Sequence, residues 1–128
     1  MAAETREIAE QFEKGLQQME QSGNVEELAQ FFAEDAVLGN LGVANDLHGT
    51  EGAREFWQRY LGQFREVHSE FFHTLVGDHE AVLEWESKGT LKNGRPIDYR
   101  GVSILRLKED GKVGEFQTYY DTAAFVTK

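Results

Sequence analysis

The stretch that decides the fold is residues 80–121, which read EAVLEWESKGTLKNGRPIDYRGVSILRLKEDGKVGEFQTYYD. Polar and apolar residues alternate along it, and the pairs Asn93-Gly94 and Asp110-Gly111 interrupt the alternation twice. Alternation with a period of two is typical of a strand with one buried face. Asn-Gly or Asp-Gly between two such runs indicates a tight hairpin turn of type I′, in which both central residues have positive φ. The stretch therefore predicts three consecutive antiparallel strands.

The pattern changes on the N-terminal side of this stretch. Apolar residues at helical spacing predict a helix over residues 3–21, a short second helix after Asn24 and a third helix with Thr50 as its N-cap. A brief strand is expected at residues 35–40, and a two-residue bridge near 46–48. The alternating part predicts four long strands, at residues 66–76, 80–92, 95–108 and 112–122. Helices first and an antiparallel meander afterwards indicate an α+β fold, with three helices from the N-terminal half packed on the concave face of a curved antiparallel or mixed sheet.

Composition narrows the classes of protein that the chain can represent. Its 128 residues, 40% of them hydrophobic and only one a proline, predict a single ordered domain spanning residues 1–128. Thirteen basic against 23 acidic residues give a net charge of −10, which would repel phosphate backbones and anionic lipid, so we expect no nucleic-acid or membrane partner. The chain has no cysteine, which excludes disulfides and thiolate chemistry. The first residues lack the apolar run of a signal peptide, so we expect a cytoplasmic protein.

Four short motifs carry a resemblance to a known family: residues 31–36 (FFAEDA), 48–52 (HGTEG), 99–103 (YRGVS) and 110–113 (DGKV). Together with the order of the elements, they resemble the nuclear-transport-factor-2-like superfamily, and more narrowly its SnoaL-like, ketosteroid-isomerase-like and limonene-epoxide-hydrolase-like branches. The resemblance covers nearly the whole chain. It implies a cone-shaped, cystatin-like roll whose open end admits a small, largely apolar ligand, and a homodimer formed through the convex face of the sheet.

The ketosteroid isomerase pattern is not preserved at its catalytic positions. Matching the two patterns puts Leu16 at the oxyanion tyrosine, Asn40 at the aspartate base and Ser103 at the protonated aspartate. That chemistry needs a base that removes a proton next to a carbonyl, and an amide cannot do this. The resemblance therefore does not imply that mechanism in its usual form.

The epoxide hydrolase pattern is preserved in part. Asn40 matches the water-orienting asparagine of that branch, whereas its Asp-Arg-Asp triad falls on Glu86, Lys88 and Thr118. One acid and one base remain, in exchanged order. The resemblance makes Glu86 a candidate general base, with Lys88 stabilising negative charge and Asn40 nearby, in a set that could activate a water molecule.

Which face of the second long strand is inward decides whether this set can act. Side chains at Glu86 and Lys88 leave the same face of the strand, and Leu83 and Trp85 leave the other. The resemblance implies that Glu86 and Lys88 face the cavity and that Leu83 and Trp85 form a dimer interface on the outer face. Hydrophobicity alone favours the reverse, with both apolar residues in the core and the charged pair in solvent. We adopt the orientation that the resemblance implies.

The same orientation supplies candidate ligand contacts, some of them with an open alternative. Tyr99, Ser103, Thr118 and Tyr120 fall on the predicted inward face, where their hydroxyls would orient a ligand, although tyrosines are equally common in a core with one wet end. Phe56 and Tyr60 belong to an aromatic stripe on the third helix that packs in the core first and touches ligand only at its edge. Leu16 adds an apolar contact.

The histidines do not suggest a metal site. His73 is the best acid/base candidate if its face is inward, but it lies five residues from His68, so the two point to opposite faces and cannot hold one metal. We expect no metal and no cofactor. The sequence leaves two classes of function open: a cofactor-independent isomerase, cyclase or epoxide-hydrolase-like hydrolase acting on a small apolar molecule, or a non-catalytic ligand-binding or dimerising module.

Overall fold

The computed structural model describes residues 2–40 and 46–126. Its helices are α1 (Ala2–Ser22), α2 (Glu26–Ala29), α3 (Gly49–Gly62) and the 3₁₀-helix η1 (Thr122–Phe125). Its strands are β1 (Phe32–Asn40), β2 (Leu47–His48), β3 (Phe64–Val76), β4 (Glu80–Leu91), β5 (Pro96–Leu107) and β6 (Val113–Tyr120). The predicted α+β class is confirmed, with helices in the N-terminal half and four long strands after them.

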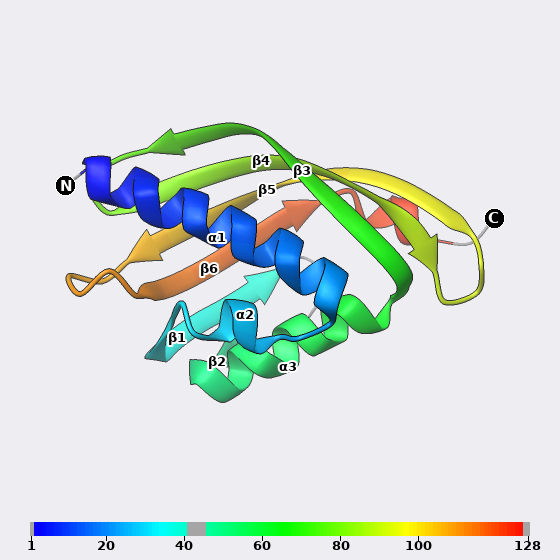
Figure 1. The fold of residues 1–128 in the computed structure, drawn as a ribbon, viewed down its shortest axis with the longest axis horizontal. Coiled ribbons are helices and arrows are strands. Elements are labelled where there is room, and N and C mark those ends of the chain that lie inside the picture. The colour runs from blue at the N-terminus through cyan, green and yellow to red at the C-terminus, as the bar shows by residue number, and fades with distance from the viewer. Residues whose placement is uncertain (1, 41–45, 127–128) are drawn as a thin grey trace.

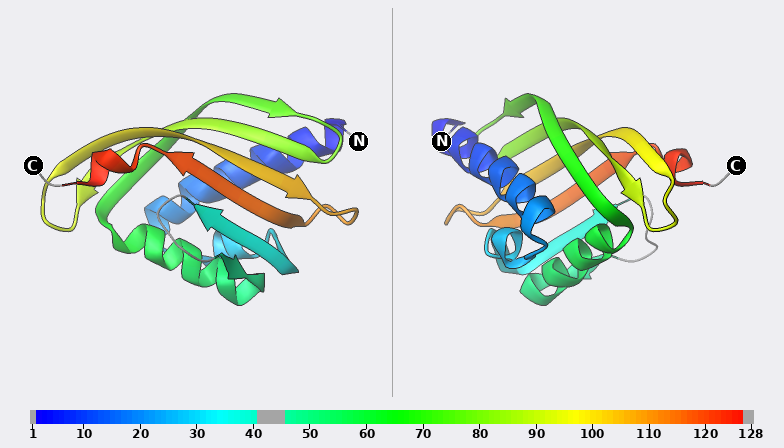
Figure 2. Two further views of the ribbon diagram at one scale, coloured as in Figure 1. Left: turned by 180° about the vertical axis from the view of Figure 1, so that it is seen from behind. Right: turned by 45° about the vertical axis from the view of Figure 1, so that its right-hand side comes forward.

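The strands form one curved, mixed sheet in the order β2-β1-β6-β5-β4-β3. Strand β1 runs parallel to β6, and all the other neighbours are antiparallel. Figure 1 shows α1 crossing the concave side of the sheet, with α3 alongside β1 and the chain ends at opposite ends of the sheet. Seen from behind in Figure 2, the long strands lie in front of α1, so the concave face points toward the helices.

Two local predictions near the helices are wrong. Strand β1 begins at Phe32, before the strand predicted at residues 35–40, because the Val113 N–H donates to the Phe31 carbonyl and brings this segment beside β6. Helix α3 begins at Gly49, whose φ is 74°, and its N-cap is His48 without a side-chain hydrogen bond rather than Thr50.

The two hairpins predicted at Asn93-Gly94 and Asp110-Gly111 have three-residue loops, so the predicted type I′ turns are wrong. The Gly94 N–H donates to the Leu91 carbonyl over 2.9 Å, and Gly94 has a φ of 90°. In the described part of the chain only glycines have positive φ, so Asn93 does not. Its side chain instead accepts from the Arg95 N–H at 2.9 Å. This pattern is a turn followed by a left-handed glycine bulge, and the loop around Gly111 repeats it.

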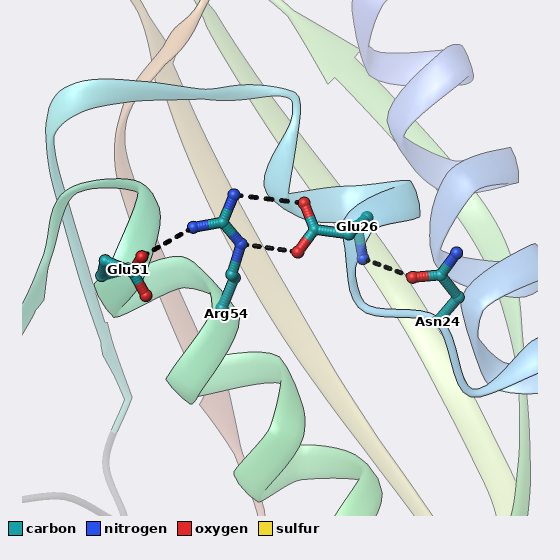
Figure 3. A network of polar contacts seen from close by, with 4 residues as sticks. All are labelled: Asn24, Glu26, Glu51 and Arg54. Atoms are coloured by element: carbon teal, nitrogen blue, oxygen red, sulfur yellow. Dashed lines mark hydrogen bonds and ion pairs between the residues drawn. The ribbon is translucent and has the colours of Figure 1, made fainter.

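Helix α2 is short, and polar contacts at the surface attach it to α3 (Figure 3). The Asn24 side chain accepts from the Glu26 N–H at 3.0 Å in the turn that leads into α2, whose N-cap is Val25. The Glu26 carboxylate receives two hydrogen bonds from the Arg54 guanidinium, at 2.5 and 3.2 Å, and Arg54 also donates to Glu51 over 3.0 Å. The planar guanidinium thereby joins the start of α3 to α2.

Helix α1 lies along the edge strand β3 and bonds to its outer backbone. Gln17 Nε2 donates to the Ser69 carbonyl over 3.0 Å, and the Ser69 N–H donates to Glu20 Oε1 over 2.8 Å. One turn before Gln17, Glu13 accepts from the Thr74 hydroxyl at 2.6 Å. These bonds satisfy an edge that would otherwise be open for pairing with another chain. They also bring the Glu20 carboxylate to the inner side of the sheet.

The predicted orientation of β4 is wrong. Leu83 is fully buried and Trp85 is only 8% exposed within the single chain, so neither forms an outer dimer interface. Between and after them Glu84, Glu86 and Lys88 lie on the convex, solvent side. Hydrophobicity decided the orientation. Burial of the two large apolar side chains is favourable, whereas burial of the charged pair would cost desolvation free energy.

Candidate functional site

A cavity of about 250 Å³ lies between the concave face of the sheet, α1 and α3. It is lined by Phe12, Leu16, Leu47, Phe56, Trp57, Arg59, Tyr60, Gln63, Ser69, Phe71, Leu83, Trp85, Ser87, Tyr99, Ser103, Phe116, Thr118, Tyr120 and Phe125. Arg59 and Gln63, at the end of α3, are the exposed members of this lining, so the mouth lies on that side.

The inner end of the cavity is built from aromatic rings. Phe12, Phe56, Trp57 and Phe116 pack mostly edge to face, with ring centroids 4.9 to 6.4 Å apart. Nearer the mouth Tyr99 contacts Trp85 and Phe125, at 5.3 and 4.8 Å between centroids. The Trp85 indole lies across Gly101, where any side chain would collide with it. The glycine therefore makes room for the indole.

A first row of hydroxyls crosses the sheet from α1 to β5. Glu20 Oε2 accepts from the Tyr60 and Ser69 hydroxyls, both at 2.6 Å. Ser69 Oγ lies 2.6 Å from Ser87 Oγ, and Ser87 is paired in register with Tyr99. Ser69 has one hydroxyl proton and gives it to Glu20, so Ser87 donates to Ser69. The row therefore directs its protons away from the cavity and toward the carboxylate.

A second row follows one step further along the strands. Trp85 Nε1 donates to Ser103 Oγ over 2.9 Å, and Ser103 Oγ lies 2.9 Å from Thr118 Oγ1. Thr118 in turn reaches the Val102 carbonyl at 3.5 Å. Asn40 pairs in register with Thr118 at the end of β1, but its side chain lies outside the described part of the structure.

Burial changes the acidity of the groups in the first row. Desolvation raises the pKa of Glu20 above its ordinary value, although hydrogen bonds from Ser69 and Tyr60 oppose this rise. Desolvation also raises the pKa of Tyr60 and Tyr99, and the nearby Glu20 charge adds to it. Both phenols therefore keep their protons at neutral pH.

The predicted ligand-contact residues lie in this cavity, with one exception. The seven that line it are Leu16, Phe56, Tyr60, Tyr99, Ser103, Thr118 and Tyr120. His73 does not, because it lies on the convex side of β3 beside Glu84, with 2.6 Å between Nδ1 and Oε1. As an acid/base group for this cavity, His73 is excluded by its position.

The predicted catalytic pair lies on the opposite face of the sheet. Glu86 and Lys88 are absent from the cavity lining, and Glu86 contacts Asp98 on the neighbouring strand. That contact, a hydrogen bond between two carboxyl groups, raises the pKa of Glu86. The backbone of β4 separates both side chains from any ligand in the cavity.

Sequence reasoning missed Glu20, Ser69 and Ser87. A signal for Glu20 was present, because Phe12, Leu16 and Glu20 are spaced four apart and share one face of α1. A carboxylate in line with a buried apolar stripe indicates an inward polar group. Ser69 and Ser87 had no such signal, since a single serine on an alternating strand is common on either face.

Three further features of the described residues are relevant to function. Among them, no three His, Cys, Asp or Glu side chains gather in a way that could hold a metal ion. None of the helices in residues 2–40 and 46–126 is both long and apolar enough to cross a membrane. Two buried side-chain nitrogens, Trp57 Nε1 and Arg95 Nε, have no hydrogen-bond partner within the described structure.

Solved structures of similar fold cover most of the chain. A nuclear-transport-factor-2-like protein from Anabaena variabilis ATCC 29413 has a TM-score of 0.84 at 17% identity, covering 97% of this chain and 94% of that one. A protein with a ketosteroid-isomerase-like fold from Catenulispora acidiphila DSM 44928, in complex with trimethylamine, has a TM-score of 0.78 at 16% identity, over 89% and 88%. SalBIII, an epoxide hydrolase/cyclase-like enzyme with a role in pyran ring formation in the polyether salinomycin, has a TM-score of 0.76 at 17% identity, over 94% and 92%.

No curated protein matches the chain. The family of SnoaL-like domains matches residues 12–116, which include α1 from Phe12 onward and the sheet as far as Phe116 in β6. This match identifies the chain as a member of the SnoaL-like family, and the solved structures show that it has the nuclear-transport-factor-2-like fold.

Proposed function

We propose that the cavity reversibly binds one small, largely apolar molecule that carries at least one polar group. The observation that carries this proposal is the combination in one cavity of an aromatic inner end with two hydrogen-bonded rows of hydroxyls. Aromatic walls supply affinity by burying apolar surface, and a few fixed polar atoms supply orientation.

The size of the cavity limits the ligand. At about 250 Å³ it is smaller than the roughly 300–1,000 Å³ typical of sites for drug-sized molecules. A compound with one ring, or with two small fused rings, fits this volume better than a four-ring steroid. Two structural neighbours, a protein in complex with trimethylamine and an enzyme with a role in pyran ring formation, are consistent with small ligands in this fold.

A cofactor-independent isomerase, cyclase or hydrolase is the second candidate, and Glu20 is the observation that favours it. Its carboxylate is linked to the lining through Ser69 and Ser87, so a proton could pass along that row. Glu86 and Lys88 no longer support this candidate, because they lie on the other face of the sheet. We place binding first, because Glu20 itself does not line the cavity.

Thermal shift with a panel of small terpenoid alcohols, epoxides and aromatic compounds tests the binding proposal. A molecule that binds only the folded state raises the melting temperature, and the rise grows with the logarithm of the ligand concentration relative to its Kd. Leu16→Trp should fill the cavity and abolish the shift, whereas Leu75→Trp, at an exposed position on β3, should leave it unchanged. Equal shifts in both variants would contradict binding in this cavity. Turnover of a bound compound by the wild type, lost in Glu20→Gln, would favour the enzyme.

We also propose that a second copy of the chain packs on the convex face of the sheet. Tyr119 is 44% exposed there, next in register to the half-buried Val102. The same face holds Val82 paired with Ile104, which gives an apolar strip across the sheet in place of the predicted Leu83 and Trp85. Val102→Glu should convert a dimer to monomers in light scattering without a loss of folding.

The expected cytoplasmic location stays a prediction.

A further inference from the structure

We propose that the cavity selects ligands that carry a protonated amine, and that the row formed by Glu20, Ser69 and Ser87 holds the ammonium group. This inference rests on the proposed binding function and adds the chemical class of the ligand. It follows from the direction of the hydrogen bonds, from the charge of Glu20 and from the rings around the row.

The first step is the direction of the hydroxyl protons. In the row nearest α1, Tyr60 and Ser69 both donate to Glu20, and Ser87 donates to Ser69. In the other row, if Thr118 gives its proton to the Val102 carbonyl, Ser103 donates to Thr118 and accepts from Trp85. What remains for a ligand at Ser87, Ser103 and Thr118 is lone pairs. These three oxygens therefore accept hydrogen bonds, and a ligand donor complements them, whereas the O–H groups of Tyr99 and Tyr120 are donors elsewhere in the lining.

The second step is the charge behind this wall. Glu20 is partly buried, and three donors reach its two oxygens, an arrangement that suits the ionised carboxylate. Within residues 2–40 and 46–126 no Lys or Arg forms an ion pair with it. An anion held away from water without a cationic partner is costly, so a ligand cation close to it gains more than it would at a solvated surface.

The third step is the surroundings of the row. The rings of Tyr60, Tyr99 and Trp85 line the same part of the cavity, and aromatic faces attract cations, most strongly when water is excluded. Arg59 is the cation in the lining, but it is exposed at the mouth and forms an ion pair with Glu55. The Trp57 N–H, a donor, is buried with no accessible surface at its nitrogen. The net charge of −10 also favours the approach of a cation.

Four probes of matched shape test the inference: 2-phenylethylamine, 2-phenylethanol, ethylbenzene and phenylacetate, titrated against the protein at pH 7.5 and followed by NMR. We expect the amine to bind at least tenfold more tightly than the alcohol, and the carboxylate to bind most weakly. If the alcohol or the hydrocarbon binds as well as the amine, the inference is overturned while the proposed binding function stands. If none of the four binds, both are overturned for ligands of this size.

Glu20→Gln locates the effect, because the amide oxygen can still accept from the Ser69 N–H while the charge is lost. We expect the preference for amine over alcohol to fall below about threefold, with affinity for the alcohol nearly unchanged. Glu86→Gln is the matched control, since it removes the same charge from the convex face, and it should keep the full preference. An unchanged preference in Glu20→Gln would overturn the assignment.

A pH titration of the wild type gives a second readout that does not depend on the folding of a variant. Protonation of Glu20 below neutral pH should weaken binding of the amine and leave binding of the alcohol unchanged. The charge of His68 on β3 also acts on Glu20, whereas Tyr60 and Tyr99 keep their protons. The pH dependence should therefore persist in His68→Gln, and its loss in that variant would assign the effect to the histidine.

Discussion

The two faces of β4 differ in every property that matters for function, although they share one backbone. The concave face presents Leu83, Trp85 and Ser87, all buried, to the cavity. The convex face presents Glu86 and Lys88 to solvent. Because the side-chain period is two, a shift of one residue exchanges the faces completely. The comparison shows that a motif match at distant similarity can put a charged pair where the apolar pattern forbids it.

Replacing Trp85 with alanine should produce the largest difference between the faces. The indole is 8% exposed and donates to Ser103, so its loss leaves a cavity and removes one of the hydrogen bonds of Ser103. We expect a loss of about 3–5 kcal/mol in the free energy of unfolding, measured by urea denaturation. Val82→Ala, on the convex side of the same strand, should lower the free energy of unfolding by about 1 kcal/mol.

The opposite result would restore the orientation that the resemblance implied. If Trp85→Ala kept its stability but lost a dimer in light scattering, the indole would have to lie in an interface between copies. If Val82→Ala were as destabilising as Trp85→Ala, the convex face would be as well covered as the concave one.

Adding one methyl group at Gly101 should sharpen the comparison with a smaller effect. A Cβ there would meet the Trp85 ring and the backbone carbonyl of Tyr119, and the carbonyl cannot move away without distorting β6. Gly101→Ala should therefore cost about 1–3 kcal/mol by overpacking.

Gly114→Ala is the matched control for this substitution. The nearest atoms to its new methyl group are Cγ and Cδ of the Lys108 side chain, which can change rotamer without moving the backbone, at the cost of its ion pair with Asp35. Thermal unfolding should show a clearly lower melting temperature for Gly101→Ala than for Gly114→Ala. Equal melting temperatures would mean that the indole does not lie across β5.

Sequence patterns predicted the fold well because they record periodicity, which belongs to single segments. The alternation from Glu66 onward predicted four strands, and the Gly94 and Gly111 positions marked both hairpins. Loop length escaped prediction, since Asn-Gly suits a two-residue turn and a three-residue loop with a bulge equally well.

The site was only partly predictable because it depends on which elements meet. Tyr99, Ser103 and Thr118 were expected in the cavity, and they line it. The Glu20 contact with Ser69 joins positions 49 residues apart, and it exists because α1 lies along the edge of β3. Such a contact follows from the packing of a helix on a sheet and leaves no mark in the local sequence pattern.

The pH dependence of stability gives the smallest and most specific test, because it compares the Glu20 and Glu86 carboxyl groups directly. Burial raises the folded-state pKa of Glu20 above its unfolded value, so the folded state holds that proton more tightly. Its contribution is fully present below the unfolded pKa and is lost as pH rises through the folded pKa. Urea denaturation between pH 3 and 7 should therefore show a flatter profile of unfolding free energy against pH for Glu20→Gln than for the wild type.

Glu86 is the control carboxyl group on the convex face. Contact with Asp98 also raises the pKa of Glu86, but this group lies in solvent, where screening leaves little effect on stability. If Glu86→Gln flattened the profile more than Glu20→Gln did, the carboxyl group whose pKa affects stability would be the one on the convex face.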